Sequence, residues 1–148
     1  MQTHAELTTP VPFTSSTIRG TRLQVLTGRA LSGFAVLFLT FDGVIKLIPN
    51  QLVVEASQQL GYRPEDMLGI GITLLACLAL YVIPRTAPLG ALLLTAYLGG
   101  AVATHVRIGN PLFSHVLFPI YVAALVWGGL FLRDARVRAL LAPRSRSR

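Results

Sequence analysis

The sequence is poor in cysteine and in charged residues. Its 148 residues include one cysteine, Cys77, so the chain has no CxxC motif and no pair for an internal disulfide. Charged residues make up 13% of the chain, about half of the ~25% found in soluble domains. So few charges leave too little polar surface to cover a soluble core. These shortages argue against a thiol–disulfide enzyme and against a soluble domain.

Apolar residues are abundant and gather in long runs. They form 53% of the chain, and the mean hydropathy is +0.62. A helix crosses the hydrocarbon of a bilayer with about 17–25 residues. The runs of that length cover residues 26–48, 67–83, 88–106 and 116–132. We therefore predict an all-α fold, an integral membrane four-helix bundle in contact with the lipid bilayer.

The membrane domain is expected to occupy residues 21–141, between two tails. Residues 1–20 are rich in Thr, Ser and Pro and are predicted to be flexible, and residues 142–148 form a basic tail. Between the first two spans, Asn50 and Gly61 bracket QLVVEASQQL, whose apolar residues recur at helical spacing. A short extra helix is therefore expected in the outer loop between spans 1 and 2.

Charge is distributed unevenly along the chain. Thirteen Lys and Arg against six Asp and Glu give a net charge of +7, and the arginines gather before span 1 and after span 4. The loop between spans 1 and 2 instead holds Glu55, Glu65 and Asp66 against Arg63. Because cytoplasmic flanks carry the Lys/Arg excess, we predict that both termini are cytoplasmic. The terminal arginines suit anionic lipid headgroups, and no nucleic-acid partner is predicted, since the tail lacks interleaved aromatic residues.

Small residues recur at spacings of four in every span. Such spacing lets helix backbones approach closely in lipid, either inside the bundle or between copies of the chain. The stretches are Gly28-x-x-x-Ser32, Gly69-x-x-x-Thr73-x-x-x-Cys77, Gly99-x-x-x-Ala103 and Ala124-x-x-x-Gly128. We expect these faces to form helix contacts.

An acid and a base lie inside span 1. Asp42 and Lys46 are four residues apart and share a helix face, with the acid in the favourable N-terminal position. A charged residue within a span costs ~2.5–3.5 kcal/mol on insertion scales, so its presence there is by default a reason to expect a functional site. Two interpretations stay open: a structural pair in which the lysine neutralises the acid, or one wall of a polar pocket.

Further polar residues mark the outer ends of spans 3 and 4. Tyr97 and His105 share a face of span 3, and Arg107, Asn110 and His115 lie in or beside the following turn. With Asp42 and Lys46 they are expected at similar depth, either as helix caps facing water and headgroups or as a converging polar mouth. No HxxxH or HExxH spacing occurs, so no metal site is predicted.

The sequence resembles a known family. The run PRTAPLGALLLTAYLGGAVATHVRIGNPLFSHVLFPIYVAALVWGGLFLRD, with FDGVIKLIP in span 1 and LGY at 60–62, is similar to the DoxX-like family of small bacterial membrane proteins. The resemblance covers residues 28 to 141. It implies four transmembrane helices in the inner membrane and an association with quinone-linked membrane redox chemistry. The resemblance also singles out several positions as part of the family pattern, without giving them roles: Gly43, Lys46, Tyr97, Gly99, Gly100, Thr104 and His105.

Two functional hypotheses follow for the polar mouth. In the first, it binds a quinone or another small amphipathic molecule, with Lys46, His105 and Arg107 donating hydrogen bonds and Asp42 or a histidine exchanging protons. In the second, the protein is a non-catalytic membrane subunit or a small-molecule carrier, acting through a redox protein partner or as a homo-oligomer. The residues alone do not decide whether the protein is an enzyme.

Overall fold

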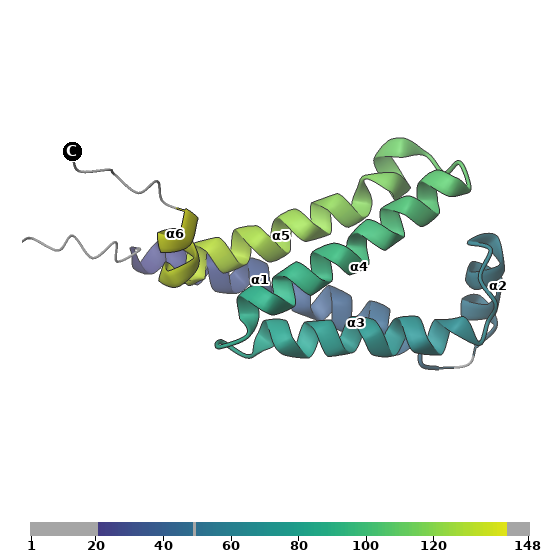
Figure 1. Cartoon of the computed structure of the whole chain (residues 1–148), viewed down its shortest axis with the longest axis horizontal. Helices are drawn as coiled ribbons and strands as arrows, with labels where there is room; N and C mark the ends of the chain where they lie inside the picture. Colours follow the sequence, from purple (N-terminus) through teal and green to yellow (C-terminus); the bar gives the residue numbers. More distant parts are fainter. Residues whose placement is uncertain (1–20, 49, 142–148) are drawn as a thin grey trace, which may run out of the picture.

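The computed structural model describes residues 21–48 and 50–141, which form helices joined by short turns (Figure 1). The tails that the sequence predicted at 1–20 and 142–148 lie outside these residues. The four long helices are α1 (Arg22–Ile45), α3 (Asp66–Val82), α4 (Ala87–Arg107) and α5 (Phe118–Arg133). The short ones are α2 (Gln51–Gln59), a π-helical turn η1 (Leu112–Val116) and α6 (Ala135–Leu141). The predicted all-α four-helix fold is confirmed.

Three helical segments are long and apolar enough to cross a membrane. They are α1, α4 and the continuous run Leu112–Arg133, which joins η1 to α5. Helix α3 is as apolar but has 17 residues, a length of about 25 Å at ~1.5 Å per residue. The fourth span therefore begins at Leu112, before the predicted residue 116, because the π-helical turn extends it toward the α4–η1 loop.

Side-chain caps set the helix starts in the first half of the chain. The Thr21 hydroxyl accepts a hydrogen bond from the Gln24 backbone N–H (3.3 Å), and the Gln24 side chain accepts one from the Thr21 N–H (3.1 Å). This capping box starts α1 at Arg22, four residues before the predicted span. Asn50 caps α2 by accepting from the Val53 N–H at 2.9 Å, so the short loop helix lies where the sequence placed it.

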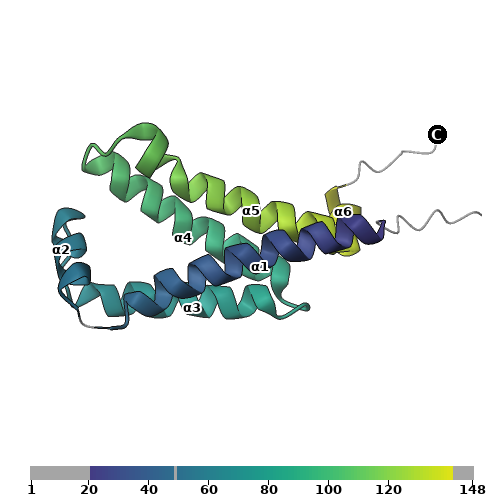
Figure 2. The ribbon, with the colours of Figure 1, turned by 180° about the vertical axis from the view of Figure 1, so that it is seen from behind.

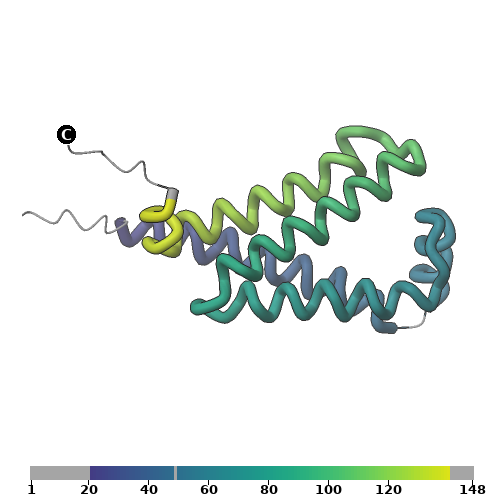
Figure 3. Tube along the Cα trace, in the orientation of Figure 1, coloured from purple at the N-terminus to yellow at the C-terminus, as the bar shows by residue number. Residues whose placement is uncertain are grey.

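The four long helices form a ring in which each packs against two neighbours: α1 on α3 and α5, and α4 on α3 and α5. Figures 1 and 2 show the helices close together at the end that holds α6, here called the closed end. Toward the other end the α1–α3 pair diverges from the α4–α5 pair, and α2 lies across this open end, as the tube in Figure 3 also shows. The bundle is therefore wedge-shaped.

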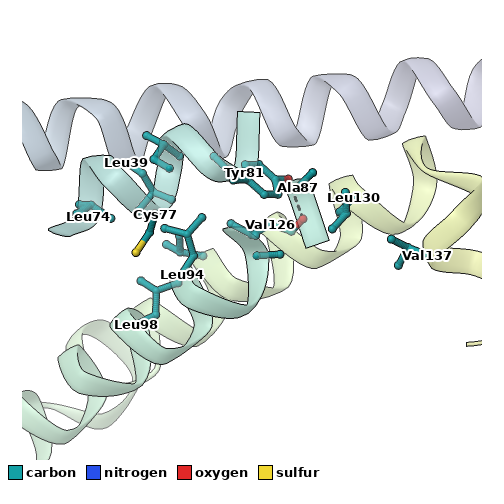
Figure 4. Packing of buried hydrophobic residues seen from close by; sticks show 14 residues of the cluster. Leu39, Leu74, Cys77, Tyr81, Ala87, Leu94, Leu98, Val126, Leu130 and Val137 are labelled. Carbon is teal, nitrogen blue, oxygen red and sulfur yellow. Dashed lines mark hydrogen bonds between the residues drawn. The ribbon is translucent and has the colours of Figure 1, made fainter. Parts of the chain in front are cut away.

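Tyr81 ties three helices together near the closed end. It is fully buried among the apolar core residues drawn in Figure 4. Its hydroxyl donates to the backbone carbonyl of Val126 (2.9 Å) and lies 2.9 Å from the Ser32 hydroxyl. Since the single tyrosine proton is used on Val126, Ser32 must be the donor to Tyr81. Buried tyrosines need such partners, and here they join α1, α3 and α5.

One of the predicted small-residue contacts forms inside the bundle. Gly28 approaches α5 so closely that an added Cβ would lie 2.7 Å from the Arg133 backbone nitrogen, and Gly129 lies equally close to Ser32. Gly129, and not Gly128, is the glycine of α5 that faces α1, which leaves a contact between copies as the open alternative for Gly128. A Cβ at Gly69, Gly99 or Gly128 would meet nothing within 4 Å, so these three glycines make no close contact within the described chain.

Helix α6 was not expected from the sequence, and Asp134 starts it. The Asp134 carboxylate accepts from the Arg136 backbone N–H (2.9 Å) and pairs with the Arg136 guanidinium (2.8 Å). The same guanidinium donates to the carbonyl of Pro84 in the α3–α4 turn at 2.5 Å. Three polar groups thus hold α6 against the closed end.

The charge of Asp134 should make this attachment sensitive to acid. The hydrogen bond from the Arg136 side chain holds the pKa of Asp134 below its usual value. A lowered folded-state pKa stabilises the fold above the unfolded pKa of ~3.9, and this stabilisation is lost as the pH falls through the folded pKa. We expect Asp134→Asn to lower the free energy of unfolding at pH 7 by up to about 1 kcal/mol.

That deficit should begin to shrink below about pH 4 and vanish once the pH is below the lowered folded-state pKa of Asp134, where the native carboxyl has also lost its charge. Denaturant unfolding in detergent between pH 7 and pH 3 measures it. Asp134→Ala is the comparison, because asparagine can still cap the helix and alanine cannot. A deficit for Asp134→Asn that stays constant with pH would contradict the assignment.

Candidate functional site

A cavity of about 500 Å³ lies between the two helix pairs, in the half of the bundle nearer the open end. All four long helices and the segment between α2 and α3 contribute to it. Its apolar wall includes Phe38, Met67, Ile70, Leu98, Phe118 and Val122. Its polar wall consists of Asp42, Lys46, Tyr62, Tyr97, Thr104 and His105. The divergence of the helix pairs therefore creates a partly open cavity with one apolar and one polar region.

Asp42 and Lys46 form an ion pair in the wall of the cavity. The Lys46 ammonium donates to the Asp42 carboxylate at 2.5 Å and to the Asp42 backbone carbonyl at 3.2 Å. The side chains are partly buried, 20% exposed for Lys46 and 36% for Asp42. A lysine ammonium has three donors, so one N–H remains for a bound molecule. Because α1 ends at Ile45, Lys46 lies at the helix C-cap, where its charge also favours the dipole.

Tyr97 reaches the cavity from the middle of α4. Its side chain lines the wall together with Asp42, and its hydroxyl makes no hydrogen bond within the described part of the chain. Tyr97 is half-buried, and a phenol removed from water usually finds a partner. The Tyr97 hydroxyl is thus a donor and acceptor that the protein leaves available to the cavity.

Tyr62 and Thr104 join the site in the structure, although the family resemblance gave Thr104 no role and Tyr62 was not among the candidate residues. The Tyr62 hydroxyl lies 2.7 Å from the Thr104 hydroxyl, which donates to the Gly100 carbonyl at 3.0 Å. Since the threonine proton is used in this way, Tyr62 is the donor of the pair. Tyr62 lies in the LGY stretch but outside every predicted span, so its approach to α4 had no local signal.

The two histidines lie together at the open end. The His105 Nδ1 atom accepts from the Asn110 side-chain amide at 2.8 Å, so neutral His105 carries its proton on Nε2. The His115 ring packs edge-on against His105, with centroids 5.7 Å apart, and its Nδ1 atom lies 2.8 Å from the Ser114 hydroxyl. Within residues 21–48 and 50–141 no group of three or more His, Cys, Asp or Glu side chains could hold a metal ion.

Arg107 lies apart from the cavity wall. Its guanidinium donates to the Leu60 backbone carbonyl at 2.6 Å and packs over Gly61, whose φ of +75° places it in the left-handed region. Arg107 therefore joins the end of α4 to the segment between α2 and α3.

The seven residues singled out from the sequence thus divide into two groups. Asp42, Lys46, Tyr97 and His105 line one cavity. Asn110 and His115 contact His105 from outside the lining, and Arg107 holds the α2–α3 segment. All of them lie in the half of the bundle toward the open end.

The fold and the cavity define a small helical membrane protein that crosses the bilayer several times and holds a partly polar cavity between its helices. The chain belongs to the DoxX-like family, whose model matches residues 30–129. No curated protein matches the chain, and no solved structure does.

Proposed function

We propose that the cavity binds a quinone or another small amphipathic molecule, and that the protein serves membrane redox chemistry. The observation that carries this proposal is the joint lining of one space by an ion pair, three hydroxyls and a histidine on one side and by apolar side chains on the other. Ligand pockets have volumes of ~300–1,000 Å³, are mostly apolar, and hold a few convergent polar groups. The cavity fits this description.

The donors of the cavity suit carbonyl oxygens. Lys46 has one N–H beyond its bonds to Asp42, Tyr97 offers a hydroxyl, and neutral His105 offers Nε2–H. When bound, a quinone supplies two-electron, two-proton redox chemistry. In this proposal Lys46, Tyr97 and His105 orient the carbonyls, and Asp42 or His105 takes up or releases a proton. Arg107 does not line the cavity and makes no direct contact with the quinone in this scheme.

Removing the Tyr97 hydroxyl tests the proposal with little effect on the fold. We expect Tyr97→Phe to raise the Kd for a short-chain quinone about 5- to 10-fold, the value of one lost hydrogen bond of about 1 kcal/mol. Thermal unfolding in detergent with increasing quinone measures the Kd through ligand-induced stabilisation.

Tyr121→Phe is the matched control, because Tyr121 is half-exposed on α5 and is absent from the cavity wall. It should bind quinone like the unmodified protein. The proposal would be abandoned if no quinone shifted the melting temperature, or if both variants changed the Kd alike. Native mass spectrometry of protein extracted gently from its membrane should then show no quinone-sized adduct.

We further propose that the protein lies in the inner membrane with both termini in the cytoplasm. Both ends of the described chain lie at the closed end (Figure 1), which also holds Arg133, Arg136 and Arg138. The open end, which holds Glu55, Glu65 and the cavity, would then face outward. Protease accessibility of the termini in sealed, oriented vesicles tests this arrangement.

A second candidate function is a non-catalytic subunit or carrier that acts through a redox partner or as a homo-oligomer. The observation favouring it is that most polar groups at the open end already bond one another, as in Asp42–Lys46 and Asn110–His105. Purification from native membranes separates the two. A partner in fixed stoichiometry supports the subunit, and a lone protein with a bound small molecule opposes it.

A further inference from the structure

A second hollow adjoins the cavity on the outer side of α3 and α4. It is lined by Glu65, Asp66, Gly69, Ile70, Thr73 and Tyr97. Ile70 and Tyr97 also line the main cavity, so these two side chains are a shared wall between the hollow and the interior. Gly69 and Thr73 are exposed residues of an apolar helix. In a membrane the side of α3 that carries Gly69 and Thr73 faces lipid.

The open end, by contrast, is crossed by the chain. Helix α2 lies over it (Figures 1 and 3), and two hydrogen bonds fasten the following segment to α4. These are Arg107 to the Leu60 carbonyl at 2.6 Å and Tyr62 to Thr104 at 2.7 Å. Along the bundle axis a ligand would therefore have to pass α2 and these hydrogen-bonded side chains, whereas between α3 and α4 it would pass Ile70 and Tyr97.

The charges beside the hollow nearly cancel. Asp66 pairs with Arg63 at 3.0 Å, and Asp42 inside the cavity pairs with Lys46. Glu65 at the rim is the remaining acid of the lining. An anionic headgroup would therefore meet a negative rim, whereas a neutral one would meet hydroxyls and paired charges.

We propose that ligands reach the cavity sideways from the bilayer, between α3 and α4 and past Ile70 and Tyr97. The ligand is accordingly a neutral amphiphile dissolved in the membrane, whose polar head enters the cavity while its apolar tail stays in the hollow beside Gly69. This inference rests on the proposed function only in that the cavity receives a molecule. The route itself can be measured without knowing the ligand.

Gly69 offers a way to narrow the route without moving the helices. A Cβ added at Gly69 meets nothing within 4 Å, so a larger side chain fits there and projects into the hollow. Gly99 on α4 is equally unobstructed but lines neither space. Gly69→Phe and Gly99→Phe are therefore a matched pair, and Thr73→Phe is a second blocking variant.

The test measures how fast two reagents modify a thiol in the cavity wall. Cys77→Ala removes the native thiol, and Ala101→Cys places one in the lining. In proteoliposomes the reagents are a long-chain N-alkylmaleimide dissolved in the lipid and a charged, water-soluble thiosulfonate. We expect Gly69→Phe and Thr73→Phe to slow the lipid reagent at least 5-fold, with Gly99→Phe and the charged reagent unchanged within 2-fold.

Three results would overturn the route: no reaction with the lipid reagent, equal slowing by Gly99→Phe, or an unchanged rate in both blocking variants. Thermal unfolding of each variant checks that the bundle is intact. Quinone binding is measured separately on the same proteins. If blocking slows the lipid reagent while no quinone binds, the lateral route stands and the proposed ligand is wrong. If quinone binds and the blocking variants do not slow the lipid reagent, the proposed ligand stands and the lateral route is wrong.

Discussion

Replacing Gly90 with alanine is expected to lower the free energy of unfolding by about 3 kcal/mol, at the upper end of the cost of overpacking. A Cβ at Gly90 would lie 2.2 Å from the Tyr81 backbone nitrogen and 2.5 Å from its Cα. These are backbone atoms of α3, so no side-chain rotation relieves the overlap. The α3–α4 hairpin would have to separate at the point where Tyr81 joins α1 and α5.

The matched control for Gly90→Ala is Gly99→Ala, nine residues further along α4. Gly99 has open space around a new Cβ, and alanine is favoured over glycine in a helix by about 1 kcal/mol. Gly99→Ala should therefore keep or slightly raise stability. Equilibrium unfolding by SDS in mixed micelles measures both variants. Gly90→Ala with native stability would show that α3 and α4 pack less closely than the structure has them.

The second large effect is expected from removing one partner of the ion pair in the cavity wall. Lys46→Met should lower the free energy of unfolding by about 2–3 kcal/mol, because it leaves the Asp42 carboxylate without its donor in a low-dielectric wall. Lys46 makes two hydrogen bonds to Asp42, at 2.5 and 3.2 Å. The double variant Asp42→Asn, Lys46→Met removes both charges and should recover to within about 1 kcal/mol of the native protein.

A double-mutant cycle on unfolding free energies measures this coupling. The cycle also needs the single variant Asp42→Asn. If the double variant loses as much stability as the two single variants added together, the two charges do not interact. The same proteins also separate the two interpretations of the pair that the sequence left open. If the double variant folds and binds quinone with native affinity, the pair is structural. If it folds and the Kd rises, the pair belongs to the ligand site.

Composition and near neighbours in the chain account for the features that could be predicted before the structure was known. Apolar runs of membrane-spanning length predict the helices, because hydrocarbon solvates them irrespective of their partners. The Asp42–Lys46 pair follows from a spacing of four on one helix, and α2 follows from its Asn50 cap and apolar periodicity. Membership of the DoxX-like family was likewise expected from the sequence and is confirmed.

Tertiary structure alone decided which distant residues meet. Tyr62 approaches Thr104 across 42 positions, and Tyr81 reaches Val126 across 45, so no local pattern could reveal either contact. Small-residue spacing predicted helix contacts but not their faces, since Gly99 and Gly90 look alike in sequence and differ completely in surroundings. The cavity exists because the helix pairs diverge toward α2. That divergence is a property of packing angles summed over four helices, which no single stretch of sequence encodes.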